Sequence, residues 1–401
     1  MKRLSVIGIA FGLTLFVVGC ATFKKPAAID QASIRLRAHT KEENGIRVST
    51  ALVDDAEARQ IFGIDLSKKR IQALWLMIEN NTDRSLLLLP SAIDPAYFAP
   101  LEVAFAFHKM FASDANKALD ELLLDMNFPT RSPILPGTKN YGYIFTSWSK
   151  HVKALDVDLI GNGFVQNFTF FDPNPNSTLS PEIFKKIDTV DSHIAPSNVA
   201  SEADLRRVLE NLPSCVTTEN GGISAEPLNI VVIGSIDDWT TAFIRRGYRY
   251  HPLPPRYAFG RSQDISGKKL RRGYMQTQAH TFRLWKTPIR YHGQTIWVGQ
   301  ASNRLGGRFA DQTDSESTRP IDPYVDESRN DLTQDLAYSQ ALIKIGYVKG
   351  AGRFQSTPSQ DPTSEIQYTT DGLRAVLVFG ARPASLDTID FFDWERLSDY
   401  H

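Results

Sequence analysis

The sequence predicts an all-β plus α+β protein: an N-terminal immunoglobulin-like β-sandwich with a helical insertion at residues 33–172, then an α+β domain with a mainly antiparallel sheet at residues 201–401. Three observations lead to this prediction. Strand-length apolar runs bounded by Gly, Asn, Asp or Pro recur through the first half. Helix and strand patterns are mixed through the second half. Between them, residues 173–200 begin with a proline-rich polar stretch that is typical of a linker.

Composition indicates a globular protein large enough for two domains. The chain has 401 residues, of which 42% are hydrophobic and 22% charged. Its formal net charge is zero, so it has no broad basic field to attract nucleic acid. We therefore exclude nucleic acid from the expected partners.

The first twenty residues predict a secretory leader. Lys2 and Arg3 precede an apolar stretch at residues 4–18, and a small residue, Gly19, precedes Cys20. An uncleaved membrane anchor is the alternative, but this stretch is shorter than the ~20 residues that span a bilayer comfortably.

The end of this leader, Val17 to Cys20, resembles the lipobox of bacterial lipoproteins. The resemblance implies a signal peptide at residues 1–19, lipidation of Cys20 and a tether at residues 20–32. In that family an aspartate after the cysteine retains the protein in the inner membrane. Ala21 occupies that position here, which implies an outer membrane lipoprotein that faces the periplasm and contacts the membrane through its lipid anchor.

The first half is expected to consist of strands with one helix. The helix is predicted over residues 113–126, where Ser113 or Asp114 would cap it and leucines recur on one side. Asn and Asp residues between the apolar runs favour turns. The predicted strands are Ile34–Arg37, Ile46–Val53, Ile71–Ile78, Ser85–Leu89, Leu101–Phe107, Tyr141–Phe145 and Phe164–Phe171.

The second half is expected to begin with a helix at residues 201–211, followed by a short continuous apolar run at residues 227–234. Such a run is typical of a central strand buried on both faces. A second helix at residues 237–246 would end at Gly247. A strand, a glycine and a helix are also the elements of a phosphate-binding loop, but this sequence lacks both glycine-rich patterns of such loops.

Residues 258–305 carry aromatic residues, arginines and glycines at strand spacing, with a predicted hairpin turn at His292 and Gly293. Asp322 as N-cap and Pro323 as first helical residue predict a long helix that ends at Gly346. Further strands are expected at residues 347–349 and 373–379.

Five segments occur in this order: Pro227–Gly234, Gly260–Asp264, His280–Trp285, Trp297–Ala301 and Ile321–Glu327. Together they resemble the LssY C-terminal domain family of bacteria. The resemblance implies an uncharacterised domain with an envelope or lipid-related role, because the family also occurs fused to membrane modules. That family often has a histidine shortly before Ile-Asp-Pro, where this chain has Arg319 and Pro320.

The densest group of polar residues predicts a candidate ligand-binding site. On a helix, Asp322, Asp326 and Arg329 would share one face, and that face could lie opposite His280 and Arg283 on a strand. Arginine would bind an oxyanion and histidine would act as acid or base. The alternative is structural, with Asp322 as a helix cap and Asp326 and Arg329 as a helical ion pair.

No known catalytic motif, paired cysteines or close pair of histidines is found, so we expect no metal and no cofactor. Cys215 is expected to be a packed side chain. The leading hypothesis is a noncatalytic accessory lipoprotein that binds an envelope lipid or a phosphate-bearing ligand. The alternative is a hydrolase that acts on a phosphate-bearing or lipid-linked envelope substrate, for which a pocket lined by His280, Arg283 and Asp326 would be expected.

Overall fold

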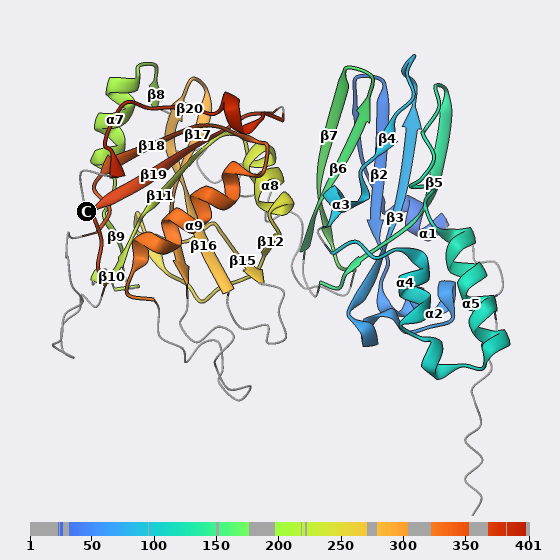
Figure 1. The fold of residues 1–401 in the computed structure, drawn as a ribbon. Helices are drawn as coiled ribbons and strands as arrows, with labels where there is room; N and C mark the ends of the chain where they lie inside the picture. Colours follow the sequence, from blue (N-terminus) through green and yellow to red (C-terminus); the bar gives the residue numbers. More distant parts are fainter. Residues whose placement is uncertain are drawn as a thin grey trace, which may run out of the picture.

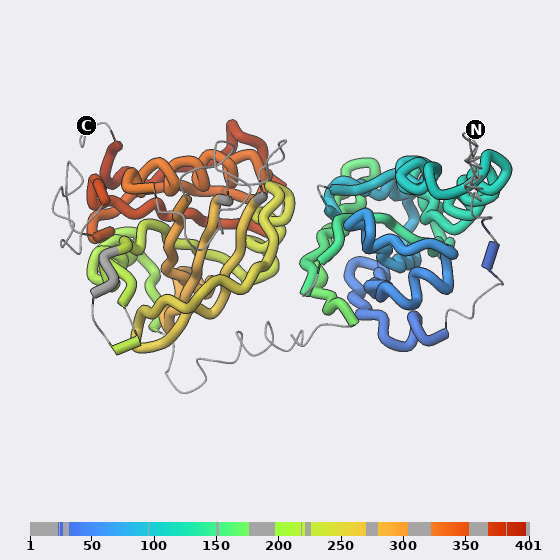
Figure 2. The backbone as a smooth tube through the Cα atoms, turned by 90° about the horizontal axis from the view of Figure 1, so that it is seen from below, coloured from blue at the N-terminus to red at the C-terminus, as the bar shows by residue number. Residues whose placement is uncertain are grey.

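The computed structural model describes residues 23, 25–26, 32–94, 96–149, 152–175, 197–217, 219–220, 223–270, 279–303, 322–352, 368–381 and 383–397. The predicted signal peptide, Cys20 and most of the tether and linker lie outside the described residues. The N-terminal part, coloured blue to green, and the C-terminal part, coloured green to red, lie beside each other (Figure 1), also when seen from below (Figure 2). The predicted boundary at residues 173–200 stays a prediction.

The N-terminal part contains two antiparallel sheets, with strand orders β1-β2-β3-β5 and β4-β6-β7. Its helices are α1 (Ala32–Leu36), α2 (Asp55–Phe62), η1 (Leu66–Lys69), α3 (Pro90–Ile93), α4 (Pro100–Phe105), η2 (His108–Met110) and α5 (Ser113–Met126). Its strands are β1 (His39–Glu43), β2 (Ile46–Leu52), β3 (Ile71–Asn80), β4 (Leu87–Leu88), β5 (Thr138–Ser147), β6 (Val152–Gly161) and β7 (Phe164–Pro173).

Both faces of the four-stranded sheet are covered. On one face, Leu74 and Leu76 of β3 pack with Leu155 of β6 in an apolar cluster between the two sheets. On the other face, Trp75 of β3 packs with residues of α2, α4 and α5. This double cover explains why nearly all of β3 is buried. This part contains more helix than the single insertion predicted for an all-β domain. The immunoglobulin-like sandwich is not confirmed.

Two predicted strands of this part are helices. Residues 34–36 belong to α1, and residues 101–105 belong to α4. Short apolar runs fit either structure, and Pro100 at the start of α4 is a helix signal that the prediction did not use. The helix predicted over residues 113–126 is confirmed, although its N-cap is Ala112, without a side-chain hydrogen bond.

The C-terminal part is built on a nine-stranded mixed sheet in which antiparallel pairs are the majority, with a second sheet of order β10-β9-β13-β14. Its helices are α7 (Glu202–Glu210), α8 (Ile236–Arg245), α9 (Val325–Ala337) and η5 (Leu386–Thr388). Its strands are β8 (Ser197–Val199), β9 (Cys215–Thr217), β10 (Ile223–Pro227), β11 (Ile230–Ile233), β12 (Tyr248–Tyr250), β13 (Tyr257–Ala258), β14 (Arg261–Ser262), β15 (Ile265–Leu270), β16 (Ala279–Tyr291), β17 (Gln294–Asn303), β18 (Leu342–Lys349), β19 (Leu373–Phe379) and β20 (Asp390–Phe391).

The large sheet has the order β12-β15-β16-β17-β11-β19-β18-β20, with β8 beside β16. The predicted central strand is confirmed, because β11 lies between β17 and β19 and is fully buried. The predicted hairpin turn is also confirmed. His292 and Gly293 join β16 to β17 with φ values of 48° and 79°, the left-handed region that a tight two-residue turn requires.

The two predicted helices before β12 are confirmed within one residue at each end. Ser201 caps α7, and its Oγ accepts a hydrogen bond from the N–H of Asp204. Ser235 caps α8 in the same way. The cap at Ser201 is a local sequence signal, which explains why the start of α7 could be predicted, whereas Ser235 is a cap that the prediction did not use.

The helix predicted from Asp322 to Gly346 is shorter than expected. It begins at Val325 and ends at Ala337, and the residues after it form β18. Gly346 therefore lies within a strand, where an added Cβ would come 2.7 Å from Phe392 Cβ. This glycine allows Phe392 to pack against β18 and does not end a helix.

Among the described residues, no helix combines the length and hydropathy needed to cross a bilayer.

Candidate functional site

The predicted site residues on β16 lie on opposite faces of the large sheet. Phe282 and Leu284 belong to the apolar cluster that includes side chains of α8 and α9. Trp285 belongs to the cluster on the other face, with α7. Because side chains alternate along a strand, His280 lies on the α8 and α9 face and Arg283 on the α7 face. The structure therefore does not bring these two residues together.

Arg329 of α9 is committed to an internal ion pair. Its guanidinium is fully buried and donates to both carboxylate oxygens of Asp371, at 2.7 and 2.9 Å, and to the carbonyl oxygen of Leu373 at 2.8 Å. Burial would lower the pKa of Arg329, but hydrogen bonds and charge from Asp371 outweigh burial and raise it. The side chain thus fastens α9 to the start of β19.

Asp326 belongs to the same structural network. Its carboxylate accepts hydrogen bonds from Thr370 Oγ1 at 2.9 Å and from the N–H of Asp371 at 2.6 Å, and lies 3.4 Å from Arg329. Burial raises the pKa of Asp326, and the positive charge of Arg329 only partly offsets this shift. The geometry therefore favours the structural alternative, in which Asp326 and Arg329 form an ion pair on the helix.

Asp322 does not share the helix face. It precedes α9, and its Oδ1 accepts a hydrogen bond from the N–H of Tyr324 at 3.0 Å, which forms a local turn. The N-cap of α9 is Tyr324. The predicted i, i+4, i+7 arrangement of Asp322, Asp326 and Arg329 is therefore wrong.

Arg283 joins a polar network that the sequence prediction missed. Its Nη1 donates to Gln300 Oε1 on β17 at 3.1 Å, and Gln300 Nε2 donates in turn to Glu226 Oε2. Arg256 Nη2 completes the network by donating to Glu226 Oε1 at 3.2 Å. A regular hairpin from the predicted turn would pair Arg283 with Ser302, and a register shift between Lys286 and Arg290 pairs it with Gln300 instead. Neither this shift nor the contacts of Glu226 could be predicted from the turn.

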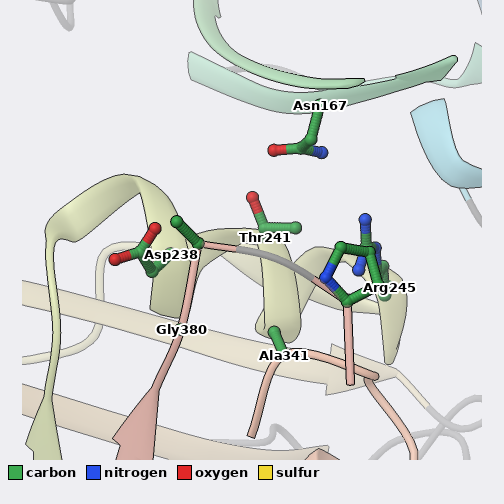
Figure 3. Close-up of a pocket in the computed structure, with 8 residues that line it drawn as sticks. Asn167, Asp238, Thr241, Arg245, Ala341 and Gly380 are labelled. Atoms are coloured by element: carbon green, nitrogen blue, oxygen red, sulfur yellow. The ribbon is translucent and has the colours of Figure 1, made fainter. Parts of the chain in front are cut away.

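A second set of charges lies where the two parts meet. Arg245 of α8 donates through Nε to Asp156 Oδ2 at 3.1 Å and through Nη2 to Asp158 Oδ2 at 2.7 Å. Burial, reinforced by the neighbouring Asp158, raises the pKa of Asp156 to about 8. Figure 3 shows Asn167 of β7 pointing toward Thr241 and Arg245 of α8.

Another ion pair strengthens this junction. Asp94 is held by Lys153 Nζ at 2.8 Å and by Arg249 Nη2 at 2.6 Å, and both carboxylate oxygens are used. Burial would raise the pKa of Asp94, but the charges of Lys153 and Arg249 outweigh it and lower the pKa. Burial lowers the pKa of Lys153, and contact with Asp94 opposes that shift.

The space enclosed at the junction is too small for an organic ligand. Its volume is about 10 Å³ (Figure 3), which is room for about one water molecule. A neighbouring apolar space, which includes Phe171 and Trp239, measures about 30 Å³. Within the described residues, these two spaces at the junction are too small for an organic ligand, and the charges there hold the two parts together.

A larger groove lies at the edge of the large sheet, beside β18 and β20. Its volume is about 350 Å³, within the range of sites that bind small molecules. Phe392 and Trp394 stack in it, with ring centres 4.0 Å apart. Arg329 lies behind it, 5.6 Å from the ring centre of Tyr347. The groove is lined by Gly346, Tyr347, Phe391, Phe392, Asp393, Trp394, Glu395, Arg396 and Leu397.

Cys215 and the described acidic residues were the remaining candidates for a thiol or metal site. Cys215 is half-buried, and its Sγ lies 3.8 Å from Tyr368 Oη, in agreement with a packed side chain. Within the described parts of the chain, no three side chains of His, Cys, Asp or Glu come close enough to hold a metal ion.

One region of the chain is similar to a known protein family. Residues 239–373 match the family model described as LssY C-terminus. The chain thus carries an LssY C-terminal domain, a family of uncharacterised function, at these residues. No curated protein matches the chain.

The LssY C-terminal domain includes most of the residues described above. It begins within α8 and ends at the first residue of β19, so it contains Arg245, Arg283 and Arg329. The aromatic residues of the groove at positions 391–397 and Glu226 lie outside the matched segment. The groove is therefore built jointly by β18 of the family segment and by the chain that follows it.

Proposed function

We propose that this chain is an outer membrane lipoprotein, anchored through Cys20 and facing the periplasm, whose C-terminal part is a noncatalytic ligand-binding module. The lipobox-like sequence from Val17 to Cys20 supports the anchor, and Ala21 supports the outer membrane. The match to the LssY C-terminal domain assigns no activity, so the binding site is argued from the geometry.

The commitment of the charged residues to internal contacts supports a noncatalytic role. Arg329 is paired with Asp371, and Asp326 is held by Thr370 and a backbone N–H. Arg283 lies across the sheet from both. A hydrolase would need His280, Arg283 and Asp326 around one cavity, and these residues are divided between two faces. The hydrolase alternative is therefore less well supported.

The groove at β18 and β20 is the observation that carries the ligand-binding proposal. Its size fits a small ligand, and its walls combine aromatic rings with a few charged groups. Phe391 is well exposed, so an aromatic face remains open to solvent. Exposed rings beside polar groups suit a ligand with both apolar and hydrogen-bonding surface.

The charges around the groove favour an uncharged ligand segment. The charged residues that line the groove are two carboxylates, Asp393 and Glu395, and one cation, Arg396. Glu395 is also paired with Arg206. A phosphate group would meet two carboxylates here and gain little. We therefore expect the groove to bind the sugar or chain portion of an envelope compound, including a lipid-linked one, through stacking and hydroxyl contacts.

Replacing Trp394 by alanine is expected to abolish ligand capture. The full chain would be screened by thermal shift against soluble envelope glycan fragments and against glycerol phosphate. A ligand at a hundred times its dissociation constant stabilises the native state by ~2.7 kcal/mol, which is readily measured. Trp394→Ala should lose this shift, measured from its own baseline, because the ring is part of the groove wall.

The matched control is Tyr141→Ala, which removes an exposed aromatic ring from β5, far from the groove in sequence and fold. It should keep the full ligand shift. The proposal fails if Trp394→Ala retains the wild-type shift. It also fails if glycerol phosphate alone gives a shift and Arg256→Gln removes it.

A further inference from the structure

The helical layer of the N-terminal part, formed by α4, η2 and α5, exposes four large apolar side chains. Leu101, Phe105, Met110 and Leu124 are 48%, 73%, 46% and 48% exposed. Leu101 and Phe105 are four residues apart on α4 and so point the same way. Single exposed apolar residues are ordinary, but several on one packed layer indicate a surface that contacts another apolar phase.

The chain that leads to Cys20 reaches the protein at this same layer. The ring of Phe23 packs edge-on against Phe111, with ring centres 5.5 Å apart, and Lys25 Nζ lies 3.9 Å from Asp125 of α5. Three residues of extended chain span at most ~10 Å. An anchor attached three residues before Phe23 would therefore enter a bilayer close to Phe23 and to the layer that Phe23 and Lys25 contact.

We propose that the α4–η2–α5 layer is a bilayer-contact surface that inserts Leu101, Phe105 and Met110 into the membrane holding the lipid anchor. This inference rests on the lipid anchor of the proposed function and adds the orientation of the protein on the membrane. The C-terminal part lies at the opposite end of the molecule from α5 in both views (Figures 1 and 2), so its groove is held away from the bilayer.

The contact is hydrophobic in nature and not electrostatic. Residues 100–126 contain five acidic and two basic residues, so attraction to anionic lipids does not drive it. Side chains of this kind give weak, reversible membrane contact on their own. An anchor a few residues away keeps them at high local concentration near the bilayer, which makes the contact persistent. Added salt should therefore leave it unchanged.

Nitroxide labels on the full acylated chain test the surface. Single labels would be placed through Leu101→Cys or Phe105→Cys in a Cys215→Ser background, with Leu386→Cys as control. Leu386 is 53% exposed and lies in η5 of the C-terminal part. The protein would be reconstituted in vesicles of three parts phosphatidylethanolamine to one part phosphatidylglycerol. Labels at 101 and 105 should become accessible to oxygen and shielded from a nickel chelate, and the label at 386 should stay accessible to nickel.

A second arm uses the unacylated full chain, Cys20→Ala, and measures partitioning into the same vesicles by flotation. Adding Phe105→Ser should lower partitioning at least about tenfold, because a large apolar side chain no longer enters the bilayer. The control for this arm is Leu386→Ser, which should leave partitioning unchanged.

The outcomes distinguish the proposed contact surface from the proposed lipid anchor. Mass spectrometry of the protein shows whether Cys20 is acylated. Acylated protein that floats with nickel-accessible labels at 101 and 105 overturns the surface and leaves the anchor standing. Protein that is not acylated but shows shielded labels removes the anchor and supports the surface. If the protein is not acylated and its labels are not shielded, both the anchor and the contact surface are contradicted.

Discussion

Replacing Arg374 by methionine is expected to lower the free energy of unfolding by about 3–5 kcal/mol. The buried guanidinium donates to five backbone carbonyl oxygens, and a net ~1 kcal/mol is typical of each such bond. Burial lowers the pKa of Arg374 to about 10, so the group remains charged at neutral pH. Its acceptors are the carbonyl oxygens of Leu209, Leu212, Pro213, Leu228 and Gly350.

The size of this effect follows from where the acceptors lie. Leu209 is in the last turn of α7, where carbonyl groups lack the regular helical partner, and Leu212 follows the helix end. Leu228 precedes β11 and Gly350 follows β18, so one side chain of β19 ties α7 to the central strands. Methionine matches the apolar volume but removes the guanidinium donor from all five carbonyl groups, of which that of Leu209 keeps a backbone donor, the N–H of Leu212.

Urea unfolding followed by tryptophan fluorescence would measure the change. Arg374→Lys should recover only part of the loss, because an ammonium group cannot reach five acceptors. The matched control is Arg290→Met, at an exposed residue of β16, which should change stability by less than about 0.5 kcal/mol. A loss below about 1 kcal/mol for Arg374→Met would contradict this account of α7.

Replacing Arg245 by methionine is expected to have the second large effect, a decrease of about 3–5 kcal/mol in the free energy of unfolding at pH 8. Arg245 is the cation between Asp156 and Asp158, and its removal leaves two buried carboxyl groups without their positive partner. Because Arg245 is in α8 and the aspartates are in β6, this loss also weakens the junction between the two parts.

The pH dependence identifies the group responsible. Native Asp156 binds its proton at about pH 8, whereas an aspartate in the unfolded chain does so near ~3.9. Between these values the native state binds one proton more, so stability contributed by this group rises as the pH falls from about 8 toward ~4, by up to ~1.4 kcal/mol per unit. The loss in Arg245→Met should therefore be smaller at pH 5 than at pH 8.

Unfolding curves at pH 5, 6, 7 and 8 would test this sign. Asp156→Asn should flatten the dependence, since its amide does not titrate. Arg207→Met, which removes an exposed ion pair with Asp204 on α7, serves as control and should cost less than about 1 kcal/mol at every pH. Equal losses for Arg245→Met at pH 5 and pH 8 would show that Asp156 does not control the junction.

The elements that could be predicted from sequence are those whose signals are local. The cap Ser201, the continuous apolar strand β11 and the turn at His292 and Gly293 each depend on a few neighbouring residues. The structure therefore agrees with them closely. Family resemblance likewise depended on several separated segments, and the match at residues 239–373 confirms it for that region.

Elements decided by packing were predicted less well. The apolar run at α4 alternates as a strand would, yet Val103 and Phe107 are buried as a helix face against Leu119 of α5. Ile343 fits the helical spacing of α9 but lies beyond the helix C-cap Tyr338, in β18, which pairs with β19. In both cases a distant layer selected between two structures that the local pattern allows.

The prediction of the candidate site was wrong for a related reason, because its residues are positioned by the sheet and by distant partners. The grouping of His280 with Arg283 ignored that an odd separation on a strand places residues on opposite faces. The partner of Arg329, Asp371, is 42 residues away, and no local spacing indicates it. The groove combines Tyr347 with Trp394, which meet only because β20 pairs with β18.

Metabolic labelling with a radioactive fatty acid tests the central claim, the lipid anchor, most directly. Wild-type protein should incorporate the label, fractionate with the outer membrane and yield a mature amino-terminal peptide that begins at position 20 and carries acyl chains. Cys20→Ala should incorporate none and be found as a soluble periplasmic protein or as uncleaved precursor. Label that persists in Cys20→Ala, or a wild-type peptide that begins elsewhere without acyl chains, would contradict the account.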